Sequence, residues 1–157
     1  MREASLEDIT KFLKCNRVAF VGVSRNSQHF SRALFREFLA RGYDAVPVNP
    51  QATEIEGRTC FARISDIDPV AESALLITGA SKATDQAVRD CHQAAIRNIW
   101  IYKSVCGSAD HEQAMSLTRS HGAAIVEGYC PFMFLPQTAF IHRIHRFMTK
   151  ATGCYPH

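Results

Sequence analysis

Apolar and polar positions along the chain form a repeating order of short apolar runs and longer amphipathic stretches. The apolar runs have the length and composition of strands buried on both faces of a parallel sheet, and they occupy residues 18–23, 45–48, 74–77, 98–102 and 123–126. Segments with a helical period lie between them, at residues 31–42, 81–95 and 109–120. This alternation predicts an α/β fold, a Rossmann-like, doubly wound parallel sheet of about five strands.

Two further amphipathic segments are expected to be helices at the ends of the chain. Leu6, Ile9 and Phe12 share one side of an N-terminal helix that Ser5 is placed to cap. Residues 138–150 predict a basic C-terminal helix, whose apolar stripe we expect to pack on this fold or on a second subunit. The loop between the second and third strands also carries apolar residues that are expected to pack at the sheet edge: Ile55, Phe61, Ile64 and Ile67.

The first strand, its loop and the following helix predict a phosphate site. Gly22 ends the strand, a polar loop follows, and Ser31 has the chemistry of a helix N-cap. The first N–H groups of a helix lack intrahelical partners and carry the positive end of its dipole, so they attract anions. An ordinary βαβ unit without a ligand remains the alternative for this segment.

The residues that follow the predicted strands are expected to line the same site. Ligands of open parallel sheets bind beyond the carboxyl ends of the strands, near the point where the strand order reverses. The polar or small residues that follow the five predicted strands are therefore candidates: Ser24-Arg25, Asn49-Pro50, Thr78-Gly79, Lys103-Ser104 and Glu127-Gly128.

The loop differs from the dinucleotide-binding fingerprint. That fingerprint, G-x-G-x-x-G, is followed by a carboxylate at the end of the second strand. Here only Gly22 matches a glycine position, and the second strand ends in Asn49-Pro50. The loop instead offers Arg25 and several hydroxyls, which suit a ligand with more phosphate charge than NAD.

These segments resemble a known family. The stretches VAFVGVSRNSQHFSRALFREFLARGYDAVPVNP, EIEGRTCFARISDI, NIWIYKSV and GYCPFMFLP are similar to the small stand-alone CoA-binding proteins related to the CoA-binding domain of the succinyl-CoA synthetase alpha subunit. The similarity covers residues 17–135. It implies coenzyme A or an acyl-CoA as the ligand, in a Rossmann-like domain.

The resemblance also implies roles for individual residues. Gly22 would let the ligand approach the backbone, while Ser24, Arg25 and Ser31 would contact phosphates, with Arg32 or Lys103 as further sources of charge. The adenine and ribose would lie against four residues, Asn49, Pro50, Ile55 and Gly57, and Thr78 and Gly79 would line the site further along. On this basis Gly22→Asp should abolish CoA binding and leave the fold intact.

The chain departs from the family pattern at two strand ends. After the third strand the family usually has an arginine followed by proline, and this chain has Thr78-Gly79. After the fourth strand it often has glutamine and glycine, and this chain has Tyr102, Lys103 and Ser104. The pantetheine half of the site is therefore less supported by the resemblance than the adenine half.

No motif predicts a reaction. The chain lacks a G-x-S-x-G elbow, a P-loop and an H-E-x-x-H pair. A reactive Cys106 and a metal site from Cys130, His142 and His145 are possible chemistries, but a bystander thiol and a solvated helix face explain these residues more simply. We expect binding or sensing rather than turnover.

Two alternatives of other classes remain at this point. One is an NAD(P)-binding oxidoreductase or redox sensor. The other is a protein-interaction module with a degenerate nucleotide site, which would use the basic C-terminal helix and an aromatic patch at residues 132–134. The same patch, if uncovered, makes a homodimer plausible.

Composition limits the number of domains, the class of partner and the cellular location that we expect. The 157 residues are 46% hydrophobic and 21% charged, typical of one globular domain spanning 1–157. The net charge of +3 is too small to argue for nucleic acid, and no apolar run is long enough for a membrane span. The N-terminus lacks the apolar core of a signal peptide, and the six cysteines form no C-x-x-C pair, so we expect a cytoplasmic protein.

Overall fold

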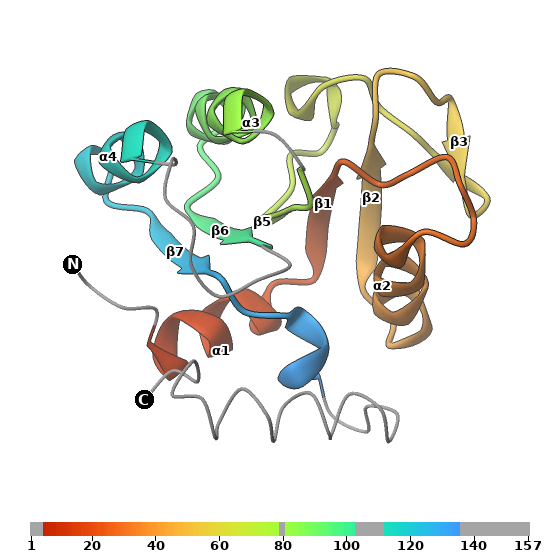
Figure 1. Ribbon diagram of the computed structural model, residues 1–157, viewed down its shortest axis with the longest axis horizontal. Helices are drawn as coiled ribbons and strands as arrows, with labels where there is room; N and C mark the ends of the chain where they lie inside the picture. The colour runs from red at the N-terminus through yellow and green to blue at the C-terminus, as the bar shows by residue number, and fades with distance from the viewer. Residues whose placement is uncertain (1–4, 79–80, 103–111, 136–157) are drawn as a thin grey trace.

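The computed structural model describes residues 5–78, 81–102 and 112–135, and it has three layers. A five-stranded parallel sheet lies in the middle, with α1 and α2 on one face and α3 and α4 on the other (Figure 1). The sheet strands, in the spatial order β2-β1-β5-β6-β7, are Asp44–Val48, Arg17–Val21, Ser73–Leu76, Asn98–Ile101 and Ala124–Glu127. The helices are α1 Leu6–Lys14, α2 Phe30–Ala40, α3 Ser81–Gln93 and α4 Glu112–Ser120.

The predicted α/β fold is confirmed, and each of the five predicted strands is present. Helices cover both faces of the sheet, so every residue of β5 is buried, as are the three central residues of β1, whereas the edge strand β7 has only Val126 buried. The N-terminal helix is also confirmed, with Ser5 and Asp8 forming a capping box at its start. The predicted C-terminal helix, residues 138–150, lies outside the described residues.

The core has two halves, one on each face of the sheet. On the α1 and α2 face, Phe20 packs edge-on against Phe35 and Phe38, and Phe12 packs edge-on against Trp100. The α3 face is more aliphatic, with Val88 and Cys91 of the helix fully buried together with a group of sheet and loop residues: Val46, Ile64, Leu76, Ile99 and Ile101.

A small hairpin interrupts the connection between β2 and β5 that the sequence predicts as a loop. Its strands are β3 Glu54–Ile55 and β4 Arg58–Thr59, and the chain then forms the 3₁₀ turn η1 at Ile64–Asp66. Ile55 and Ile64 are buried as expected, while Phe61 is partly buried and pairs with Val48 through an isolated bridge. Asp44 of β2 forms ion pairs with Arg17 of β1 and Arg58 of β4, which ties the hairpin to the sheet.

The strand order reverses between β1 and β5. From β1 the chain passes to β2 on one side, and it later returns to β5 on the other side before continuing to β6 and β7. The connections that follow β1 and β5 therefore leave the sheet in opposite directions, which is where open α/β sheets bind their ligands. No helix among residues 5–78, 81–102 and 112–135 is long and apolar enough to cross a membrane.

Candidate functional site

Gly22 sits at the reversal point and joins β1 to its loop. Its φ is +89°, and a Cβ atom added there would overlap the carbonyl oxygen of Ile77, with the side chain of Thr78 3.6 Å away. The ends of β1 and β5 are thus in contact through this glycine. Any side chain would push them apart, so Gly22→Asp would disturb the fold itself, contrary to the sequence-based expectation.

The loop after β1 is folded on itself by its own polar groups. The Ser24 hydroxyl accepts the N–H of Asn26 at 3.1 Å, and the Asn26 side chain accepts the N–H of Gln28 at 2.9 Å. The Asn26 carbonyl accepts the N–H of His29 at 3.1 Å. These short-range bonds are typical of Ser and Asn in turns, and they give the loop one defined shape.

The N-cap of α2 is His29, so the prediction that Ser31 caps this helix is wrong. His29 Nδ1 accepts the N–H of Ser31 at 3.2 Å, and the Ser31 hydroxyl lies 2.8 Å from the same nitrogen. Ser31 is fully buried, and its hydroxyl accepts the N–H of Ser24 at 2.9 Å. Ser31 therefore holds the loop onto the helix from within.

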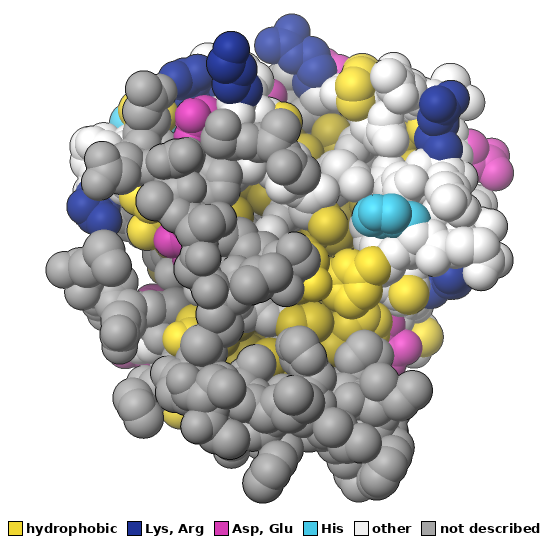
Figure 2. Space-filling model, viewed as in Figure 1, with side chains coloured by type: hydrophobic (Ala, Val, Ile, Leu, Met, Phe, Trp, Pro, Cys, Tyr) yellow, Lys and Arg dark blue, Asp and Glu magenta, His cyan; other side chains and the backbone are white. Residues whose placement is uncertain are grey.

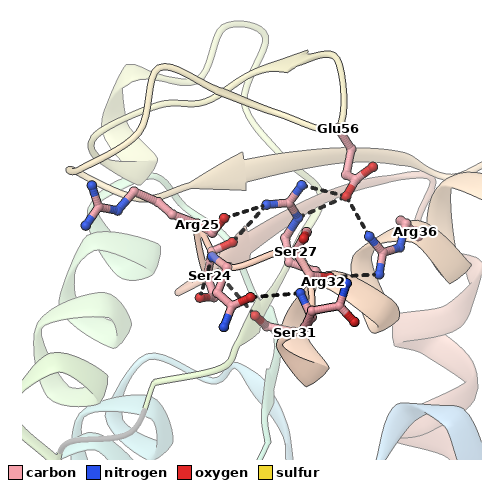
Figure 3. Close-up of polar contacts among 9 residues, drawn as sticks. Ser24, Arg25, Ser27, Ser31, Arg32, Arg36 and Glu56 are labelled. Atoms are coloured by element: carbon pink, nitrogen blue, oxygen red, sulfur yellow. Dashed lines mark hydrogen bonds and ion pairs between the residues drawn. The ribbon is translucent and has the colours of Figure 1, made fainter.

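The N–H groups of Arg25, Ser27 and Phe30 have no protein acceptor among the described residues. They lie in the loop and at the first residue of α2, beside the positive end of its dipole. The guanidinium of Arg25 is exposed and has no hydrogen bond or ion pair within the described part of the chain. In Figure 3 its side chain extends away from Arg32 and Arg36 of α2. This edge of the loop offers donors and positive charge.

A second group of charges connects the loop with the hairpin. Arg32 of α2 donates to the carbonyls of Ser24 and Arg25, both at 3.2 Å, and to Glu56 Oε1 at 2.6 and 3.0 Å (Figure 3). Arg36, one turn further along α2, donates to the same carboxylate oxygen at 2.9 Å. Hydrogen bonds from Arg32 hold the pKa of Glu56 below its usual range. Arg32 is thus a structural link in this loop.

Several of the residues that the resemblance places at the adenine and ribose make contacts within the protein that support the fold. The Asn49 amide donates to the Val23 carbonyl at 2.8 Å, and its oxygen accepts the N–H of Gln51 at 2.8 Å, so Asn49 joins the ends of β1 and β2. Pro50 beside it is exposed. The side chain of Ile55 is buried in the core, and Gly57 forms the hairpin turn with φ +71°.

Aromatic residues that the sequence-based interpretation did not assign lie on the other side of the loop. Phe30, at the start of α2, stacks on Tyr102 at the end of β6 with 4.9 Å between ring centroids, and Phe132 approaches Phe30 edge-on at 5.7 Å. Phe132 belongs to the turn η2, Pro131–Met133. Figure 2 shows a hydrophobic surface in this region, between α2 and η2 of Figure 1. Tyr102 is one of the residues by which this strand end departs from the resembled family, and that departure is the signal that could have revealed this stack.

The far end of the site is described only in part. The Thr78 hydroxyl bonds to the hydroxyl of Thr84 on α3, which fixes the chain as it leaves β5. Gly79, Lys103 and Cys106 lie outside the described residues. The structure therefore brings several predicted positions together near the reversal point: Gly22, Ser24, Arg25 and Thr78, with Ser31 and Asn49 bonded to the same loop.

The less favoured chemistries considered from the sequence gain no support from the described residues. Within them, no group of three metal-binding side chains is close enough to hold an ion. Burial raises the pKa of the Cys130 thiol to about 11, and His142 and His145 lie outside the described part of the chain. Phe132 and Met133 are buried, so the proposed aromatic interaction patch is not exposed at these two positions.

Comparisons with solved structures reproduce this fold. A hypothetical protein from Pyrococcus horikoshii OT3 aligns with a TM-score of 0.73 and 24% identity, covering 83% of this chain and 92% of that chain. A conserved hypothetical protein from Pyrococcus furiosus aligns with a TM-score of 0.64 and 22% identity, covering 73% of this chain and 95% of that chain.

A larger enzyme contains a similar fold. The dinucleotide-forming acetyl-coenzyme A synthetase 1 of Ca. Korarchaeum cryptofilum aligns with a TM-score of 0.58 and 21% identity, covering 72% of this chain and 26% of the enzyme. At these identities the three likenesses show the fold alone.

Comparison at the level of sequence gives the family. No curated protein matches this chain. The family model for the CoA binding domain matches residues 16–136, which is most of the chain and includes every element from β1 to η2. The protein belongs to the CoA-binding domain family.

Proposed function

We propose that this protein binds coenzyme A or an acyl-CoA, with the phosphates on the loop between β1 and α2, and that it serves in binding or sensing. Membership of the CoA-binding domain family supports a CoA-type ligand in general. The placement on this loop and the non-catalytic role are our inference from the geometry.

The observation that carries the proposal is the set of free donors on the loop. The N–H groups of Arg25, Ser27 and Phe30 have no acceptor within the described chain, although the neighbouring N–H groups of Ser24 and Asn26 do. Backbone N–H groups at a helix start, together with a free guanidinium, are suited to phosphate oxygens. The loop therefore fits the diphosphate of CoA.

The rest of the ligand follows from the position of this loop. The adenosine would lie toward Pro50 and the hairpin, and the pantetheine would run toward Thr78 and the stacked pair of Phe30 and Tyr102. Aromatic rings and a threonine methyl group suit the methyl and methylene groups of the pantetheine arm. NAD-binding sheets use a carboxylate at the end of the second strand to bind the ribose. Here that position is Asn49, whose amide is bonded through both its nitrogen and its oxygen within the protein, so the carboxylate has no counterpart.

The described side chains favour binding over turnover. Burial raises the pKa of the Cys60, Cys91 and Cys130 thiols, so their reactive thiolate forms are disfavoured at neutral pH. None of these three lies in the loop with the free donors.

Thermal shift and calorimetry with four ligands test the proposal. CoA and acetyl-CoA should raise the melting temperature, because a ligand at 100 times its dissociation constant stabilises the folded state by about 2.7 kcal/mol. NAD and NADP should give little or no shift. A shift with NAD alone would support the oxidoreductase alternative, and no shift with any of the four would overturn the proposal.

The variant Arg25→Glu tests the placement on the loop. Because the Arg25 side chain is exposed and has no partner within the described residues, the unliganded melting temperature should not change. The affinity for CoA should fall by about tenfold or more, since one charge-assisted contact of about 1.5 kcal/mol is lost and a like charge replaces it. Arg89→Glu on the exposed side of α3 is the matched control. Equal CoA affinity in both variants would place the phosphates elsewhere.

A further inference from the structure

Arg36 is the arginine of this site that combines an anion contact with access to solvent. Its side chain is 46% exposed, whereas that of Arg32 is 11% exposed. Arg36 donates to Glu56 Oε1 at 2.9 Å and to the carbonyl of Ser27 at 3.1 Å. Arg32 directs its guanidinium to Glu56 and to two loop carbonyls. An anion from outside could therefore reach Arg36 without dismantling the loop.

The charges around Arg36 are not balanced. Arg32 and Arg36 share a single carboxylate, and their bonds all go to one of its two oxygens, Oε1. Arg25 adds a further positive charge on the other side of the loop (Figure 3). The group therefore retains net positive charge after the pairing with Glu56, as expected of a surface that takes up an additional anion.

The position of Arg36 matches one chemical feature of CoA. The ribose of CoA joins the adenine to the 5′-diphosphate and carries a 3′-phosphate as a branch, so this third phosphate must lie near the place where the adenosine and diphosphate sites meet. In the protein, the hairpin is expected to border the adenosine and the loop is expected to hold the diphosphate. The ion pairs of Glu56 with Arg32 and Arg36 connect these two elements.

We propose that Arg36 binds the 3′-phosphate of the ribose, with Glu56 yielding its place on this arginine, so that the protein distinguishes CoA from dephospho-CoA. This inference rests on the proposed function, because it assumes that the diphosphate lies on the neighbouring loop. A phosphate presents more oxygens and more charge than a carboxylate, so it competes well for a guanidinium.

Calorimetry with CoA and dephospho-CoA at one fixed ionic strength tests this subsite. The wild-type protein should bind CoA about tenfold more tightly than dephospho-CoA, the effect of one charge-assisted contact at a half-exposed site. In Arg36→Gln the ratio of the two affinities should fall close to one, mainly through weaker CoA binding. Arg89→Gln, on the other face of the sheet, should keep the wild-type ratio.

A second variant, Glu56→Gln, changes the charge in the opposite direction. Glutamine keeps an oxygen acceptor for Arg32 and removes the negative charge that competes with the phosphate. We expect the ratio of CoA to dephospho-CoA affinity to rise severalfold. Circular dichroism and melting curves of both variants establish that they are folded before their affinities are compared.

The outcomes separate this inference from the proposed function. Equal affinity of the wild-type protein for CoA and dephospho-CoA would overturn the 3′-phosphate subsite and leave the diphosphate site standing. A preference for CoA that persists in Arg36→Gln would also overturn it. A failure of both ligands to bind the wild-type protein would refute the proposed function, and this inference with it.

Discussion

Single residues at the site have two kinds of role, support of the loop and contact with a ligand. The buried Ser31 hydroxyl and the Asn49 amide bond to backbone groups of the loop and the strand ends. Gly22 lets the ends of β1 and β5 meet. Arg25, exposed and unpaired within the described residues, is the member of the predicted set that is open to a phosphate. Residue types that suggest a ligand can thus serve to shape its site.

Gly22→Ala tests the supporting role of this glycine. The added methyl group would overlap the Ile77 carbonyl, and the φ of +89° is itself unfavourable for alanine. Urea unfolding should show a loss of roughly 2–4 kcal/mol, from backbone strain and overpacking together. Gly42→Ala is the control, because its φ is +84° and an added Cβ would have no atom within 4 Å. Equal losses in both variants would mean that the Ile77 contact is unimportant.

The sequence predicts these residues better than it predicts their roles. Gly22, Ser24 and Arg25 are found because they follow a strand whose apolar run is unmistakable. The N-cap was misassigned because Ser31 is the better capping residue by type, while the imidazole nitrogen of His29 fills that position in space. Ile55 is buried, as its apolar pattern predicts, so the separate expectation that it borders the adenine or ribose is the one that its position in the core weakens.

At the scale of elements, local patterns predict the sheet, and long-range contacts decide how the connections are arranged. The five strands of the sheet have strong apolar runs, so the sequence reveals each of them. The hairpin strands have two residues each, too few for any periodicity. The link between Glu56 and Arg32 joins positions 24 residues apart, and no spacing rule predicts it.

The contact between the ends of α3 and α4 makes a prediction about pH. His92 stacks on His121 with ring centroids 4.3 Å apart, and the buried Nε2 atom of His92 has no hydrogen-bond partner in the described part of the chain. Burial, and then the charge of His121, lowers the pKa of His92 below its usual value of about 6.5. The folded state therefore binds a proton less readily than the unfolded state, and stability falls as the pH drops below about 6.5.

Urea unfolding at pH 7.5 and pH 5.5 measures this effect. His92→Gln should reduce the loss of stability between the two pH values, because the half-buried imidazole whose pKa burial lowers is then absent. Lys11→Gln, in an exposed ion pair on α1, changes a charge elsewhere and should keep the wild-type dependence. A pH dependence unaltered by His92→Gln would assign the effect to other groups.

At the scale of the whole molecule, one sheet separates two hydrophobic cores and supports both. Trp100 is fully buried on the α1 and α2 face, where its indole N–H donates to the Tyr129 carbonyl at 2.9 Å. Cys91 is fully buried on the α3 face. Because the same five strands carry both cores, loss of one should remove the support of the other.

Two probes, one in each core, test this coupling. Fluorescence of Trp100, the single tryptophan of the chain, reports the first core, and labelling of Cys91, followed by peptide mapping, reports the second. The two urea transitions should coincide, as in a single cooperative domain. A Cys91 transition at clearly lower urea would show that the α3 side unfolds separately.

The internal bonds of the β1–α2 loop bear on the entropy of binding. Ser24, Asn26, His29 and Ser31 already fix its backbone before any ligand arrives. A loop that is ordered in advance loses little conformational freedom on binding, so most of the interaction energy can appear as affinity. These residues therefore favour ligand binding without touching the ligand, because they lower the conformational entropy that the loop would otherwise lose on binding.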